Sequence, residues 1–189
     1  MRTRQDGITL LLTILLLLGV LILGASAAKL ALSGEKAARA ERDRHIAFQA
    51  AEDALMDAER DIDGKAGPGR QAMFDSGRAE SFVPGCGRGD AAGLCAAGEG
   101  APPAWQAVDI ADGPSASHGQ FTGADMQTGQ GPLPWRRPRY IVERLPYKAP
   151  GAPADAAPAY YYRVTVLGFG AREGTEVVLQ SSYRRTVDE

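Results

Sequence analysis

The chain has 189 residues, with 21 basic and 23 acidic side chains and a formal net charge of −2. This length accommodates one modest domain plus an anchor, and the near-neutral charge argues against the basic surface that nucleic-acid binding requires. With two histidines and two cysteines, the chain shows no cluster of the roughly four ligands that a zinc site needs. We therefore expect no cofactor, no metal and no nucleic-acid partner.

An uncharged apolar run, Ile8–Ala28, follows a short polar leader, residues 1–7. As a helix this run would extend about 31 Å, which matches the roughly 30 Å hydrocarbon core of a bilayer. Arg2 and Arg4 precede the run, so the leader is expected in the cytoplasm and the rest of the chain on the far side. The run also contains Ala25-Ser26-Ala27, which fits a signal-peptidase site, so a cleaved signal peptide is a second interpretation.

Residues 29–62 predict a continuation of the same helix, so that one helix runs from about Ile8 to Ile62. They contain one glycine, no proline, and many alanine, glutamate, arginine and leucine residues, which favour helices. Apolar residues three and four positions apart form one stripe, which we expect to cover a sheet, while charged residues that include Asp57 occupy the other faces. The stripe consists of Phe48, Ala51, Leu55, Ala58 and Ile62.

The C-terminal third predicts β-strands. One strand starts at Tyr140, a second covers Tyr160–Phe169, and a third covers Glu176–Arg184 after a turn at Ala171–Thr175. These segments predict an antiparallel sheet of at least three strands and an α+β fold, with the helix covering one face. Three aromatic residues of the Gly/Pro-rich middle are expected to cover the sheet or fill the core: Trp105, Phe121 and Trp135.

A family resemblance rests on four segments and on the leader that ends in Gly7. RDRHIAFQAAEDALMDAER follows the apolar half of the helix, and RYIVERLP, YYYRVTVLGFG and VVLQSSYRR lie near the end of the chain. This layout resembles a type IV prepilin, and the segments resemble PilX-type minor pilins. The resemblance implies a pilin-like fold. In that fold a transmembrane half, 8–28, and an amphipathic half, 29–62, form one helix, which packs on an antiparallel β-sheet head, 63–189.

The resemblance implies cleavage between Gly7 and Ile8 by the prepilin peptidase, followed by N-methylation of Ile8. Most pilins carry glutamate at the fifth mature position, where this chain has Leu12. That glutamate pairs with the terminal amine of a neighbour, which would otherwise be an unpaired charge in an apolar filament core. Leu12 cannot form the pair, which favours a minor, priming or tip-proximal subunit over the main building block. Phe48 and Leu55 of the amphipathic half are expected to take part in assembly as well.

The resemblance further implies a non-catalytic subunit that takes part in pilus assembly and supports twitching motility and attachment. The implied partners are the inner membrane, the prepilin peptidase, other minor and major pilins, and a PilY-type tip adhesin. The head would be periplasmic before assembly and extracellular afterwards. Two alternatives are a minor pseudopilin of a type II secretion system and a secreted or periplasmic binding protein with a cleaved signal peptide.

Cys86 and Cys95 are expected to form a disulfide if the head faces an oxidising compartment; two free thiols or a metal pair are the alternative. The loop between them contains the receptor-like tripeptide Arg88-Gly89-Asp90, which also arises by chance in such Gly-, Arg- and Asp-rich sequence. A triad of Ser115, His118 and Asp112 can be drawn, but the chain lacks a nucleophile elbow, a phosphate loop and a metal motif. We therefore expect that the protein is not an enzyme.

Overall fold

The computed structural model describes most of the chain, which divides into two compact units, residues 1–42 and 43–189. Helix α1, Asp6–Ile62, supplies the first unit and continues into the second. Every residue from Ile8 to Arg42 is exposed, so this part of α1 contributes no core. The described residues are 6–64, 68–74, 79–98, 100–148, 150–151, 153 and 159–185.

Helix α1 extends over 57 residues and ends at Ile62, where the sequence predicts its end. Two hydroxyls within the apolar run bond back to the helix: Thr13 donates to the carbonyl of Leu10 and Ser26 to that of Ile22, each at 2.8 Å. Beyond the last turn, Gly64 adopts a φ of +81°, a conformation that glycine reaches without steric cost and that commonly ends helices.

Within the described residues of the second unit, five strands form one sheet, with the order β1-β3-β4-β5 and with β2 paired to β3 outside this path. Strand β1 is parallel to β3, and the other pairs are antiparallel. The three predicted strands correspond to β3, β4 and β5, whereas β1 and β2 were not predicted. The strands are β1 (Leu94–Ala96), β2 (Ala116–Ser117), β3 (Arg139–Tyr147), β4 (Ala159–Phe169) and β5 (Glu176–Tyr183).

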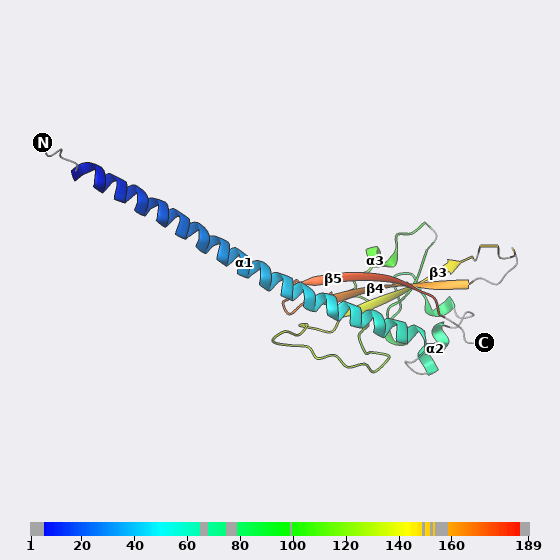
Figure 1. Cartoon of the computed structure of the whole chain (residues 1–189). Coiled ribbons are helices and arrows are strands. Elements are labelled where there is room, and N and C mark those ends of the chain that lie inside the picture. The colour runs from blue at the N-terminus through cyan, green and yellow to red at the C-terminus, as the bar shows by residue number, and fades with distance from the viewer. Residues whose placement is uncertain are drawn as a thin grey trace. The chain divides into compact units, whose positions relative to one another are not determined.

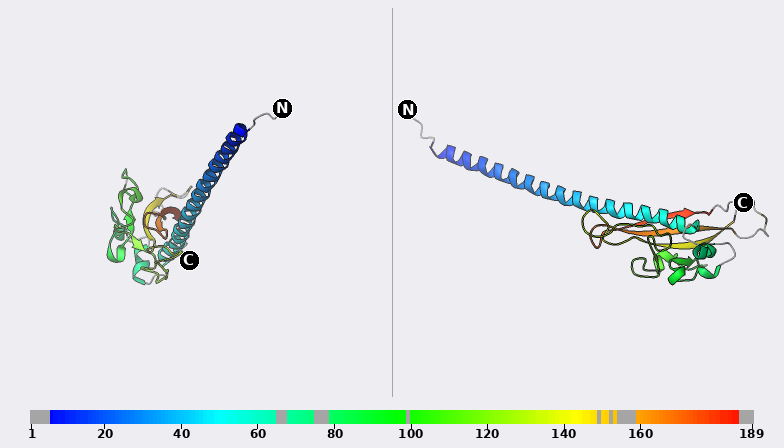
Figure 2. Two further views of the ribbon diagram at one scale, coloured as in Figure 1. Left: turned by 90° about the vertical axis from the view of Figure 1, so that its left-hand side faces the viewer. Right: turned by 90° about the horizontal axis from the view of Figure 1, so that it is seen from below.

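The sheet is covered on both faces. The cyan, C-terminal part of α1 runs along one face, and the green segment that carries α3 (Ala104–Ala107) lies on the other (Figures 1 and 2). Alternate residues of β4 enter the two layers, as a period of two requires: Val164 and Val166 face α1, and Leu167 belongs to the cluster on the far face. The other short helices are α2 (Pro68–Phe74), η1 (Ala79–Ser81) and η2 (Gly89–Ala91).

Small residues let α1 approach β4 closely. Ala47, Ala51, Ala54 and Ala58 are buried along the contact line. Opposite them, Gly168 has no side chain, and a Cβ atom built there would lie 2.3 Å from the carbonyl oxygen of Ala47. The helix and the sheet are therefore in backbone contact at this point, and their spacing depends on the absence of that one carbon atom.

Three sequence expectations about burial are wrong. Phe48 is 40% exposed, because the contact line passes through Ala47 and each step along a helix rotates the side chain by about 100°. Asp57, expected on a polar face, is fully buried, for a reason given below. Trp105 is 39% exposed, whereas Phe121 and Trp135 pack against the two core clusters as expected.

Candidate functional site

The first turns of α1 hold the residues expected to direct processing and assembly. Gly7 and Ile8 lie in the first turn, and Ile8 and Leu12 expose 69% and 55% of their surface. Among the described residues, α1 is the one helix that is long and apolar enough to cross a membrane. An uncharged helix that is apolar on every side is stable in lipid or against similar helices, which indicates membrane anchoring.

The two cysteines are joined, as predicted. Cys86 and Cys95 form a disulfide, and both are buried in the cluster on the far face of the sheet. The bridge closes a short loop whose tip exposes Arg88 and Asp90 to solvent. The loop is therefore attached to the core at its base, while its charged tripeptide is accessible.

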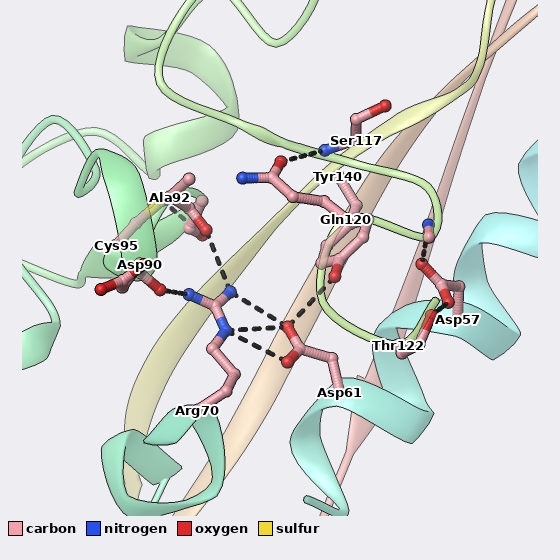
Figure 3. A network of polar contacts seen from close by, with 12 residues as sticks. Asp57, Asp61, Arg70, Asp90, Ala92, Cys95, Ser117, Gln120, Thr122 and Tyr140 are labelled. Atoms are coloured by element: carbon pink, nitrogen blue, oxygen red, sulfur yellow. Dashed lines mark hydrogen bonds and ion pairs between the residues drawn. The ribbon is translucent and has the colours of Figure 1, made fainter. Parts of the chain in front are cut away.

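A buried polar network that the sequence did not reveal joins this loop to α1. Figure 3 shows Arg70 of α2 between the carboxylate of Asp61 and the backbone of the disulfide loop. The Arg70 Nε–Asp61 Oδ1 distance is 3.1 Å, and Nη2 lies 3.0 Å from Asp61 Oδ2. The same guanidinium donates to the carbonyl oxygens of Asp90 and, at 3.0 Å, of Ala92. One side chain thus connects α1, α2 and the disulfide loop.

Burial dominates the electrostatics of this network. It raises the pKa of the Asp61 carboxyl, although the hydrogen bonds and charge of Arg70 oppose the shift. It also raises the pKa of Tyr140 well above its usual value, so the phenol stays protonated and donates to Asp61 Oδ2 at 3.1 Å. The Arg70 guanidinium lies 3.7 Å from the ring centroid of Phe121, which further shields the ion pair from water.

Two other acidic residues near this end of α1 also accept hydrogen bonds from the head. Asp57 accepts from the amide of Gly119 at 2.7 Å and from the hydroxyl of Thr122 (Figure 3). This pairing explains why a carboxylate is tolerated at a fully buried position. Beyond the helix end, Asp63 accepts from the phenol of Tyr183, and this hydrogen bond and burial raise the pKa of Tyr183 to about 12.

Asp43 performs the same task at the other end of the head. Its carboxylate accepts from the amide of Ala171 and the hydroxyl of Thr175, each at 2.6 Å, and from Arg172 Nε at 3.0 Å. Burial opposes ionisation, but these hydrogen bonds outweigh it and lower the pKa of Asp43. The residue holds the β4–β5 turn against α1. A helical sequence pattern cannot distinguish such an acid from a solvated one, because both occur at helical spacing.

The residues of the drawn triad are not brought together. Ser115 Oγ donates to the carbonyl of Ile110 and accepts from Arg139 Nε, each at 2.6 Å. Asp112 pairs with Arg136, and His118 Nε2 instead faces Asp53 at 3.6 Å. Within the described ranges there is also no group of three or more His, Cys, Asp or Glu side chains that could hold a metal ion.

Comparison with known families supports a single assignment for both ends of the chain. Residues 6–55 match the family model PilX N-terminal, and residues 91–185 match the one described as type IV pilus assembly protein PilX C-term. The C-terminal match covers just over half of the chain and contains the whole sheet. No match was found among curated proteins or among solved structures. The chain therefore belongs to the PilX family of type IV pilus assembly proteins.

Proposed function

We propose that this chain is a minor pilin that primes the fibre or occupies a position near its tip. Membership of the PilX family makes it a structural component of type IV pilus assembly. The observation that carries the finer role is Leu12, which places an apolar side chain where most pilins have the glutamate that neutralises a neighbour's terminal amine. Such a subunit is best accommodated at an end of the fibre, where no terminal amine of a neighbouring subunit lies beside Leu12.

The proposal includes processing at the start of α1. The prepilin peptidase would cleave between Gly7 and Ile8 on the cytoplasmic side, and Ile8 would be N-methylated. The helix would then span the inner membrane once with the head in the periplasm, until the subunit enters the fibre. The exposed apolar surface of residues 8–28 supports both environments, since lipid and other apolar helices solvate it equally well.

Mass spectrometry of the protein purified from its native membrane tests the processing. The expected mature chain begins with N-methylated Ile8. A chain that begins at Ala28 or Lys29 would identify Ile8–Ala28 as a discarded signal peptide and would rule out the pilin assignment of this segment.

A Leu12→Glu variant tests the position in the fibre. The added carboxylate should pair with a neighbour's amine and move the subunit from the tip region into the fibre shaft, which immunogold labelling of sheared pili can measure. Leu12→Gln is the matched control, because it adds a similar polar group without the charge. If Leu12→Glu leaves piliation and labelling position unchanged, the tip-proximal role loses its physical basis.

We also propose that the head contacts other minor and major pilins and a PilY-type tip adhesin, and that the assembled fibre supports twitching motility and attachment. The support is family membership together with an apolar helix and a separate compact head, which together suit a subunit held by its helix and displaying its head.

A further inference from the structure

Strand β5 is an edge strand whose outer side has no strand partner in the described part of the chain. It is last in the strand order and pairs with β4 alone. The amide of Gly170 donates to the carbonyl oxygen of Thr175, the residue opposite it in the register, so this pair is a hydrogen-bonded position, and in antiparallel sheets such positions alternate. Residues 177, 179, 181 and 183 therefore bond β4, whereas the backbone groups of 176, 178, 180 and 182 point outward.

This edge lacks the features that usually prevent pairing with another chain. Such features are proline, lysine, a bulge or a very short strand. The eight residues of β5, EVVLQSSY, include no proline and no basic residue, and the register with β4 is continuous. Val178 is 57% exposed. The outer edge of β5 is thus a regular, mostly uncharged template for one more strand.

The charges at the two ends of this edge indicate which strand it accepts. Glu176 begins β5, Arg184 directly follows it, and both are exposed. If a second β5 runs antiparallel with Gln180 opposite its own copy, Glu176 lies opposite Arg184 twice. The same register places Val178 opposite Ser182. We propose that the outer edge of β5 binds β5 of a second copy of this chain in this two-fold symmetric register.

The neighbouring face of α1 fits this partner. Asp57 of α1 accepts from Gly119, which closely follows β2 and its pairing with β3, so Asp57 marks the β3 side of the helix. Leu55 lies about 200° around the helix from Asp57 and therefore on the side toward β5. Phe48 lies seven residues before Leu55, hence on the same side of the helix, and is 40% exposed. A strand added to β5 would lie beside Phe48 and cover it, while Val178 would gain a cross-strand neighbour on the opposite face.

The contact is distinct from packing between the apolar helices. In the antiparallel strand pair, one head is rotated by about 180° relative to the other. Apolar helices of two copies that enter one membrane from the same side instead run parallel to each other. The interface therefore depends on residues of β5 and not on residues 8–28. Its formation and the proposed role in pilus assembly can be tested separately.

Cross-linking of the full-length chain in detergent micelles tests the register. Gln180→Cys places one thiol at the symmetry axis, so a short bismaleimide should link two copies while the Cys86–Cys95 disulfide stays intact. Glu173→Cys, on the exposed turn before β5, is the control and should link poorly. Equal cross-linking at both positions, or none at Gln180→Cys, would overturn the proposed register.

Charge exchange in the Gln180→Cys background tests whether pairing of Glu176 with Arg184 stabilises the dimer. Glu176→Arg or Arg184→Glu alone places like charges opposite each other twice and should weaken dimerisation at least about tenfold, as measured by cross-linking against concentration. The combined E176R/R184E exchange should restore it, which also shows that the variants fold. Glu173→Arg, the same charge change outside the register, should have little effect. Dimerisation that is equal in all four variants would reflect helix association and would contradict the proposal.

Discussion

At the level of single residues, the head depends on aspartates that a helical pattern places among solvated charges. Asp43, Asp57 and Asp61 are each at least 95% buried and each accept several hydrogen bonds from segments distant in sequence. A buried carboxylate without partners is costly, so each aspartate favours the one arrangement that satisfies it. These residues therefore select how loops attach to α1 more than they add net stability.

Arg70 should be the most sensitive of these contacts to substitution. Arg70→Met keeps the aliphatic length but removes the cation beside Asp61, which then keeps only the Tyr140 hydroxyl as donor, and it also removes the donor to two loop carbonyls. We expect a loss of about 3–5 kcal/mol in the free energy of unfolding. Urea unfolding followed by circular dichroism measures it. Arg137→Met removes the exposed pair with Asp125 and should cost less than about 1 kcal/mol. Equal losses in both variants would show that the buried network is not important for stability.

Asp43 should make stability depend on pH in the acidic range. Its folded-state pKa lies below its ordinary value of 3.8, so the stabilisation it provides is complete above that value and is lost as the pH falls through the folded pKa. We expect Asp43→Asn to cost about 1–3 kcal/mol at pH 7 and progressively less as the pH falls below 3.8.

Unfolding midpoints of both proteins between pH 3 and pH 7 provide this measurement. Asp125→Asn, at a carboxylate that is 81% exposed, is the control and should follow the parental curve. A difference between Asp43→Asn and the parent that does not shrink on acidification would exclude this role of the carboxylate.

At the level of elements, the fit between α1 and the sheet rests on small residues. The alanine line of α1 faces Gly168 of β4, and a larger residue on either side would separate the two backbones. Leu55 and Ile62 then fill the borders of the contact. Asp43 and Asp61 form hydrogen bonds with the head near the two ends of the same contact. The contact between α1 and the head is therefore apolar along its middle and hydrogen-bonded near both ends.

Gly168→Ala tests this spacing. The added methyl group would lie 2.3 Å from the Ala47 carbonyl oxygen and 2.7 Å from the Ala51 Cβ, so α1 must shift, at a cost of about 1–3 kcal/mol. Thermal unfolding should show a lower midpoint. Gly34→Ala is the matched control: its Cβ would meet nothing within 4 Å, and helix propensity favours alanine by up to about 1 kcal/mol. A Gly168→Ala midpoint at or above the parental one would contradict the close contact.

At the level of the whole molecule, the described core and its polar network lie entirely within the second unit. Both core clusters, the disulfide and the Arg70 network use residues between 43 and 185. Residues 8–42 are exposed throughout and add no described core contact. The apolar part of the chain, which suits a membrane, therefore contributes nothing described to the stability of the head. This separation holds although helix α1 begins in the first unit and ends in the second.

A chain that starts at Lys29 should fold in aqueous buffer without detergent. We expect cooperative unfolding at nearly the midpoint of the full-length protein in micelles, because no described core residue is removed. A chain that starts at Gly64 removes the α1 face over the sheet and should fail to unfold cooperatively. If the chain from Lys29 also lacks a cooperative transition, the apolar half of α1 is needed for the head to fold.

Features that depend on neighbouring residues were predictable from the sequence alone. Helical spacing and the absence of proline located α1 to within two residues of its start, and alternation with a Gly-containing turn located β4 and β5. The Cys86–Cys95 pairing followed from a short separation and an expected oxidising compartment. The same local patterns carried the family resemblance, which the matches to residues 6–55 and 91–185 confirm.

Only the tertiary structure decided which side of α1 meets the sheet and which acids are buried. Phe48 and Ala47 are both apolar and adjacent, and the choice between them depends on Gly168, which is distant in sequence. In the sequence, Asp57 and Asp61 have the same helical spacing as solvent-exposed acids. Only their hydrogen bonds with Gly119 and Arg70 identify them as buried residues. Strand β1 has three residues and pairs in parallel with a strand about fifty positions later, so no local pattern marks it. Local spacing determines which elements form, whereas contacts between distant segments determine how those elements meet.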